Sequence, residues 1–133
     1  MFYKKVLKKI KGKNFYKFLF SLSNKLPKFP NKYKKNKYLL KECLSNTWIF
    51  ITLKKNKIKF IGFSESNIIN GLIYLIIKVY SNKSPYRILK KNIFKYFKFN
   101  KILSINRYIS ILNIIKYIKI YTLKLIKKYK YKY

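Results

Sequence analysis

The chain has 133 residues, half of them apolar, which is enough for one domain over residues 1–133 with a modest core. It carries 34 Lys and Arg against two acidic residues and has no His, so its formal net charge is +32. The missing His excludes Cys-His and Ser-His catalytic pairs within the chain, and one Cys with two Glu excludes a tetrahedral zinc or iron–sulfur site.

The positive charge has two possible origins. Lys, Ile, Asn, Tyr and Phe dominate while Ala, Asp, Gln and His are absent, a pattern typical of A/T-rich codons, so drift in codon use explains most of the charge. The alternative is a basic RNA-binding protein of ribosomal type, in which Lys and Tyr would supply phosphate contacts and stacking faces. Drift is the preferred interpretation, because the lysines are spread along the whole chain instead of concentrated in one motif.

The N-terminal part predicts helix followed by a connector. Residues 4–25 place apolar side chains at three- and four-residue steps on both sides of Gly12, which predicts two helices or one kinked helix. Lysines interrupt the apolar stretches of residues 1–20, so we expect no signal peptide there. Pro27 and Pro30 stop the helical pattern and predict an extended or turning connector.

The middle of the chain predicts strands. Residues 38–40, 47–53 and 58–62 are rich in β-branched and aromatic residues, with polar residues between the runs. We expect three short antiparallel strands in a meander, with a turn at residues 54–56. Cys43 would then lie in the first connection, where a loop between paired strands can be both exposed and well positioned.

A buried central helix is expected next. Residues 67–80 are apolar on nearly all faces, and Ser64 or Ser66 is a suitable N-cap. We expect Gly71 to allow close packing of this helix against the sheet. The longest apolar run, residues 68–77, is too short for the roughly 18–20 residues of a membrane span, so none is predicted.

Two further helices complete an α+β pattern, a small three-stranded antiparallel sheet flanked by helices. Ser84 and Pro85 have the residue types of an N-cap and a first helical position. Ser104 or Asn106 can cap a final helix, whose basic tail at residues 127–133 is expected to fray.

Cys43 is the one thiol of the chain. A single cysteine forms no internal disulfide, which favours a reducing compartment, the cytoplasm. Nearby lysines, with Lys41 the closest in sequence, favour the reactive thiolate, whereas Glu42 or an apolar pocket would oppose it. A lone cysteine can also be a small, inert core residue.

Several segments together carry a resemblance. Their order and spacing over residues 6–125 resemble the SufE family, the sulfur-acceptor proteins of the Suf iron–sulfur assembly pathway. The Gly-Cys-Gln-Ser-Gln-Val-Trp signature of that family is similar to residues 42–48, which keep Cys43, Ser45 and Trp48 in register. The other matching segments are Leu26-Pro27, Gly62-Phe63-Ser64-Glu65, Gly71-Leu72-Ile73 with the later Tyr80 and Pro85, and Leu103 to Arg107.

The resemblance implies a function. It implies an α+β fold of the SufE and IscU-like type and a Cys43 that takes sulfur as a persulfide from a SufS-like cysteine desulfurase, which it stimulates. The sulfur would pass to a SufBCD-like iron–sulfur scaffold complex. Pyridoxal phosphate would belong to the desulfurase, so we expect an accessory protein that binds neither cofactor nor metal and is not itself an enzyme. A homodimer stays open.

The resemblance also suggests supporting residues, each with a simpler alternative. Ser45 could donate a hydrogen bond to the sulfur or only shape the turn. Arg107 could pair with a desulfurase carboxylate, stabilise the persulfide anion, or be a helix-start charge. Glu65 is expected to be a helix N-terminal charge instead of a catalytic group. Lys41 is a candidate for partner contact, and Trp48 is expected to pack the sheet on the central helix.

The chain departs from the family pattern at several positions, of which Glu42 bears on sulfur transfer itself, because it is expected to slow it. Glu42 replaces a Gly, which stiffens the loop and adds a negative charge beside an anionic intermediate. A relative that only activates the desulfurase, without carrying sulfur, is a further alternative. The other departures bear on partner recognition more than on the covalent step; they are Leu44, Phe63, Tyr108 and Ile109.

Overall fold

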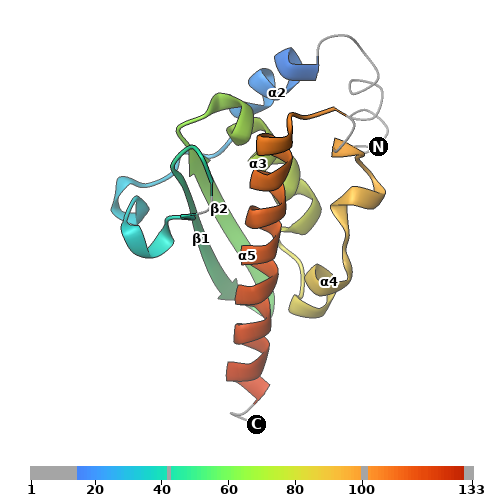
Figure 1. The fold of residues 1–133 in the computed structure, drawn as a ribbon. Coiled ribbons are helices and arrows are strands. Elements are labelled where there is room, and N and C mark those ends of the chain that lie inside the picture. Colours follow the sequence, from blue (N-terminus) through green and yellow to red (C-terminus); the bar gives the residue numbers. More distant parts are fainter. Residues whose placement is uncertain (1–14, 42, 100–101, 131–133) are drawn as a thin grey trace.

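The computed structural model describes residues 15–41, 43–99 and 102–130, and Figure 1 shows how they are arranged. In that view the helix α5 runs along the length of the molecule, with the β-hairpin to its left and α4 to its right. The described residues form an α+β fold whose sheet has two strands instead of the predicted three. In chain order the elements are α2 (Phe15–Ser23), η1 (Asn31–Tyr33), η2 (Asn36–Tyr38), β1 (Thr47–Lys54), β2 (Lys57–Ser64), α3 (Asn67–Tyr80), α4 (Pro85–Lys90), η3 (Ile93–Lys95) and α5 (Ile105–Lys130).

The sheet is an antiparallel hairpin in which β1 and β2 pair from Thr47↔Ser64 to Lys54↔Lys57. The strands predicted at residues 47–53 and 58–62 and the turn between them are confirmed. One face of the hairpin packs on α3, because a side chain at Gly62 would meet both Ile49 and Ile73. Residues alternate between the faces of a strand, so Trp48 points to the opposite face.

The prediction that Trp48 packs the sheet on the central helix was therefore wrong. Its indole is half-buried on the outer face and stacks on the ring of Phe63, with ring centroids 6.3 Å apart. Phe63 is the direct cross-strand partner of Trp48, so the two rings form an aromatic pair of the kind that stabilises hairpins.

The predicted third strand was also wrong. The run Tyr38-Leu39-Leu40 begins in the 3-10 helix η2, and Leu39 joins Trp48 only through an isolated bridge. The Leu40 N–H donates to the Thr47 carbonyl over 2.8 Å, and the chain then turns at Lys41. Because η2 takes up Tyr38 and the turn begins after Leu40, the ladder cannot extend beyond one bridge.

The central helix α3 contacts α2, β2 and α5 and is buried along most of its length. Its N-cap is Ser66, whose side-chain oxygen accepts from the Ile69 N–H over 3.4 Å. Gly71 does provide a close approach, but the expected partner was wrong. A side chain at Gly71 would overlap the backbone of Leu19, so the close contact is between α3 and α2, not between α3 and the sheet.

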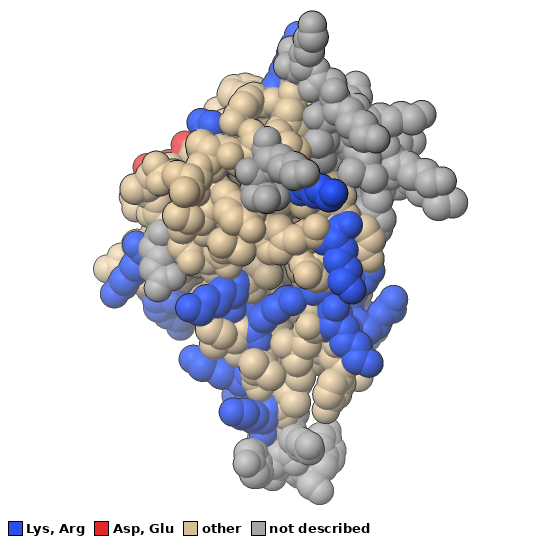
Figure 2. Space-filling model, turned by 45° about the vertical axis from the view of Figure 1, so that its right-hand side comes forward, with Lys and Arg blue, Asp and Glu red and all other residues tan. Residues whose placement is uncertain are grey.

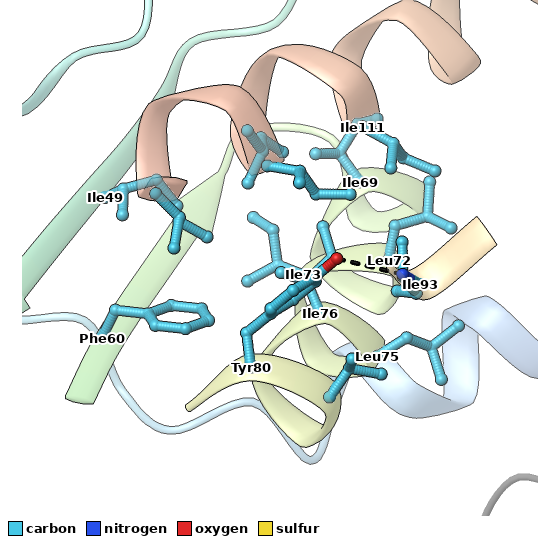
Figure 3. Close-up of a cluster of buried hydrophobic side chains, with 14 of the residues drawn as sticks. Ile49, Phe60, Ile69, Leu72, Ile73, Leu75, Ile76, Tyr80, Ile93 and Ile111 are labelled. Carbon is cyan, nitrogen blue, oxygen red and sulfur yellow. Dashed lines mark hydrogen bonds between the residues drawn. The ribbon is translucent and has the colours of Figure 1, made fainter. Parts of the chain in front are cut away.

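The core lies between the hairpin, α3 and the later helices, as Figure 3 shows. Tyr80 at the end of α3 is almost fully buried, and its hydroxyl accepts from the Ile93 N–H over 3.0 Å. This bond satisfies a buried polar group and fixes η3 on α3. Pro85 begins α4 after Ser84, as predicted.

The last helix, α5, begins after Ser104, whose side-chain oxygen accepts from the Arg107 N–H over 3.4 Å. It continues to Lys130, so the expected frayed tail at 127–133 is helical up to that residue, and residues 131–133 lie outside the described ones. The first part of the predicted N-terminal helix, residues 4–14, is also outside them. None of the described helices is long and apolar enough to cross a membrane.

Candidate functional site

Cys43 lies on a short loop, residues 41–46, between η2 and β1. The bridge between Leu39 and Trp48 and the 2.8 Å hydrogen bond from the Leu40 N–H to the Thr47 carbonyl close the base of this loop. The chain on either side of the loop is therefore tied together, although only one side continues as a strand. The prediction of a tethered loop was correct, and the prediction of two flanking strands was not.

A second anchor ties the end of the loop to the turn between β2 and α3. The Glu65 N–H donates to the Asn46 carbonyl over 3.0 Å, and the Asn46 side-chain amide donates to Glu65 Oε1 over 2.9 Å. The Thr47 hydroxyl also donates to the Ser45 carbonyl over 3.1 Å. These bonds fix the backbone that follows Cys43.

Glu65 therefore differs from its expected place. The N-cap of α3 is Ser66, so Glu65 precedes the helix and is not an acid of its first turn. Its exposed carboxylate accepts from Asn46, which makes it a support of the Cys43 loop. Sequence reasoning missed Asn46, because nothing local indicates that its amide reaches a residue 19 positions away.

A buried asparagine of α3 supports the same turn between β2 and α3. Asn70, on α3, is 5% exposed and accepts from the Ser64 N–H over 2.7 Å while donating to the Ser64 carbonyl over 2.8 Å. These two hydrogen bonds satisfy the side-chain amide of Asn70 and hold the end of β2 on α3. In the sequence Asn70 appeared only as a break in an apolar run, but a polar residue on a helix that is buried all round does indicate a specific partner.

The thiol and its neighbours face different environments. Cys43 is half-buried and packs against the edge of the hydrophobic core. Leu44 is 81% exposed, the highest value among the large apolar side chains that are exposed in the described residues. Lys41 is exposed, and Ser45 is half-buried. The loop thus keeps its sulfur at the protein edge and presents an apolar side chain to solvent beside it.

Arg107 lies in the first turn of α5 and is half-buried. Its guanidinium lies 5.1 Å from the ring centroid of Tyr16 in α2, a cation–π distance. The Tyr16 hydroxyl donates to the Ile102 carbonyl over 3.5 Å. The described contact of Arg107 therefore joins the start of α5 to α2, which gives this residue a structural role whatever else it does.

Within residues 15–41, 43–99 and 102–130, no three His, Cys, Asp or Glu side chains come together as a metal site. A pocket of about 200 Å³ opens beside the predicted Leu26-Pro27 connector. Its described lining residues include Phe29, Lys34, Phe63 and Asn70, and none of those described is acidic.

Comparison with known proteins agrees with this picture. The family model of SufE, described as an Fe-S metabolism associated domain, matches residues 4–122. The cysteine desulfuration protein SufE of Wigglesworthia glossinidia brevipalpis is 36% identical over 96 residues, which are 71% of this chain and 65% of that protein, slightly less than two thirds of its length.

A solved structure supports the fold. The solution structure of a hypothetical protein from Thermus thermophilus has a TM-score of 0.75 to this chain at 13% identity. The alignment covers 94% of this chain and 96% of that one, so the two proteins share the same overall fold. Because the family match covers most of the chain, including the Cys43 loop and both of its anchors, this protein belongs to the SufE family.

Proposed function

We propose that Cys43 is a sulfur acceptor that takes a persulfide sulfur from the active-site cysteine of a SufS-like, pyridoxal-phosphate-dependent cysteine desulfurase. The observation that carries this proposal is the position of the lone thiol of a SufE-family chain. It lies at the protein edge on a loop that is anchored at its base and at its end. A loop on a rigid scaffold suits a group that must meet a partner's active site.

The chemistry is a thiol exchange that is balanced without an oxidant. The Cys43 thiolate attacks the terminal sulfur of the desulfurase persulfide, a new S–S bond forms, and the old S–S bond breaks. The desulfurase cysteine leaves as a thiolate and takes up a proton. Delivery to a SufBCD-like scaffold is the reverse operation, in which an acceptor nucleophile attacks the terminal sulfur on Cys43.

The supporting residues act on the loop and on the charge of the sulfur. Lys41, exposed and two positions before Cys43, favours the thiolate and the persulfide anion by its positive charge. Ser45 is a candidate hydrogen-bond donor to the sulfur, and Arg107 is a candidate contact for a partner carboxylate. Glu65 positions the loop through Asn46. The desulfurase supplies the pyridoxal phosphate, so this chain acts as an accessory protein in the reducing cytoplasm.

The test is persulfide formation. Incubating the protein with the SufS-like desulfurase of the same genome and cysteine should add the mass of one sulfur atom to the intact chain. Cys43→Ser should abolish the addition, and no other cysteine can substitute. A wild-type thiol that stays unmodified, while a small-thiol acceptor is loaded under the same conditions, would contradict the proposal.

A second measurement separates sulfur carriage from activation. Cysteine turnover by the desulfurase should rise when wild-type protein is added, because the acceptor removes the sulfur from the enzyme. Cys43→Ser should bind the desulfurase without this stimulation. If Cys43→Ser stimulates turnover as strongly as wild type, the chain is an activator that does not carry sulfur.

A further inference from the structure

A basic segment leads directly into the Cys43 loop. Residues 28–41, called the lysine strap here, contain no acidic residue, and their first part lines the pocket beside α2. All of the lysines in the strap are exposed: Lys28, Lys32, Lys34, Lys35, Lys37 and Lys41. Density of charge alone does not distinguish the strap, because Figure 2 shows basic side chains over much of another face. What distinguishes the strap is its ordered structure and its position next to the Cys43 loop.

The strap is held against the outer face of the hairpin by aromatic contacts. The Tyr33 ring stacks on Phe50 with centroids 3.8 Å apart, and the Tyr38 ring meets Phe50 edge-on at 5.3 Å. The Lys34 ammonium lies 4.2 Å from the centroid of the Phe63 ring. The backbone that carries the lysines is thus ordered on folding, so a partner that binds them has less chain entropy to overcome.

The strap leads in sequence into the loop that carries Cys43 and Leu44. The strap ends at Lys41, and Leu44, 81% exposed, follows on the loop that the Leu39–Trp48 bridge closes. An exposed apolar side chain beside a row of cations has the composition of a protein interface with an apolar centre and a charged rim. Among the described residues Glu65 is the one carboxylate, and it already bonds Asn46. The charges of the strap lysines are therefore balanced by solvent ions or by a partner, and not by Glu65.

The aromatic residues of the strap argue for a protein partner over RNA. Stacking of bases needs ring faces that are open to solvent. Tyr33 and Phe50 stack on each other, and the edge-on Tyr38 completes this cluster. All three rings are half-buried, and the Tyr33–Phe50 stack covers one face of each of these two rings, which leaves less ring surface for bases than an open platform.

We propose that the lysine strap and Leu44 dock onto an acidic rim around an apolar entrance to the desulfurase active site. This inference rests on the proposed function and names the surface that brings Cys43 to its sulfur donor. Leu44 would enter the apolar entrance, and the strap lysines would pair with carboxylates around it. Charge pairs at a rim set the rate and register of docking more than the chemical step.

Two variants of equal charge test the proposal. The strap variant is Lys32→Gln, Lys35→Gln and Lys37→Gln. The control variant is Lys54→Gln, Lys57→Gln and Lys59→Gln, toward the far end of the same hairpin. At about 3.4 Å per strand residue, these positions lie roughly 17 to 24 Å along the strands from the start of β1. All six side chains are exposed, and neither variant touches Cys43, its anchors or Leu44.

The readout is the rate of persulfide formation as the concentration of this protein is varied. We expect the strap variant to raise the KM for the protein about tenfold, as three weak rim pairs imply, without changing kcat. The control variant should change KM less than twofold. Leu44→Gln, the polar residue of the family signature, should also raise KM. Poly-glutamate should compete with the desulfurase for the wild-type protein, and added salt should raise its KM.

Each other result overturns the inference in an identifiable way. Equal effects of the two lysine variants would mean attraction by net charge alone. An unchanged KM in the strap variant, or no competition by poly-glutamate, would show that the strap does not bind an acidic rim of the desulfurase. Strap-dependent binding of single-stranded RNA, with transfer unaffected, would assign the surface to nucleic acid. If wild-type protein accepts no sulfur at any concentration, the proposed function itself has failed, which is distinguishable from all of these.

Discussion

Gly71 shows how one missing side chain sets the distance between two helices. A methyl group at this position would overlap the backbone of Leu19, which cannot move without shifting α2. Gly62 is a useful contrast, because its added methyl would lie 2.7 Å from Cδ1 of Ile49 and 3.2 Å from Cγ2 of Ile73. Both neighbours there are the ends of side chains, so they can move at lower cost.

Gly71→Ala should therefore destabilise the protein much more than Gly62→Ala. Alanine gains about 1 kcal/mol over glycine in helix propensity, so a net loss of about 2 kcal/mol at Gly71 would report the overlap with α2. Gly62→Ala should cost about 1 kcal/mol or less. Urea denaturation gives both values, and a Gly71→Ala protein as stable as wild type would contradict the close approach of the two helices.

Residue types were easier to predict from the sequence than their partners. The sequence indicated that Gly71 allows close packing and that Cys43 lies on a tethered loop, because glycine and turn patterns act locally. It could not indicate that Leu19 faces Gly71 or that Asn46 reaches Glu65, because these contacts join segments that only the fold brings together. The roles of Ser45 and Arg107 in sulfur transfer stay predictions.

Between β1 and β2, the hairpin turn consists of Lys55 and Asn56. Both residues have positive φ, 52° and 61°, as a type I′ turn requires. Asn tolerates this left-handed backbone, whereas Lys at the first position has no side-chain reason to favour it. The hairpin turn therefore forms although Lys55 disfavours a positive φ, because the pairing of the two strands outweighs this preference.

Replacing the turn by Lys55→Asn with Asn56→Gly should stabilise the hairpin, because Asn-Gly is the preferred type I′ pair. We expect a gain of about 1 kcal/mol in the free energy of unfolding, measured by urea denaturation. Lys55→Gln removes the same charge without favouring positive φ and should leave stability nearly unchanged. Equal gains in both proteins would attribute the effect to charge instead of turn geometry.

At the scale of elements, periodicity predicted the hairpin, α3 and the start of α4 and α5, since these depend on local sequence. The predicted strand at residues 38–40 failed because its composition suits a strand but its length allows only one bridge to Trp48. Whether a segment forms a strand depends on the segment that it pairs with, and a run of three residues gives no information about that partner. The same limit placed Trp48 on the wrong face.

The molecule as a whole has a net charge of +32, which makes it costly to bury any one of its lysine ammonium groups. Lys119 on α5 nevertheless donates from Nζ to the Lys91 carbonyl over 2.7 Å and lies 5.7 Å from the centroid of the Tyr80 ring. The Tyr80 hydroxyl donates to the same carbonyl over 3.3 Å. The contact thus joins α5, α3 and the segment after α4, and burial lowers the pKa of Lys119 from its ordinary 10.5.

This lowered pKa predicts a pH dependence of stability. Between the folded pKa of Lys119 and 10.5, the unfolded chain binds more protons than the folded one, so this group makes folding more favourable as pH rises through that window. Lys119→Met lacks the titration. The stability of wild type minus that of Lys119→Met should therefore increase from pH 8 to about pH 10.5, in urea denaturation at fixed ionic strength. Ionisation of tyrosines remote from Lys119 affects both proteins and cancels in the difference. A difference that stays constant or falls across this range would show that the ammonium group is as well solvated in the folded protein as in the unfolded chain.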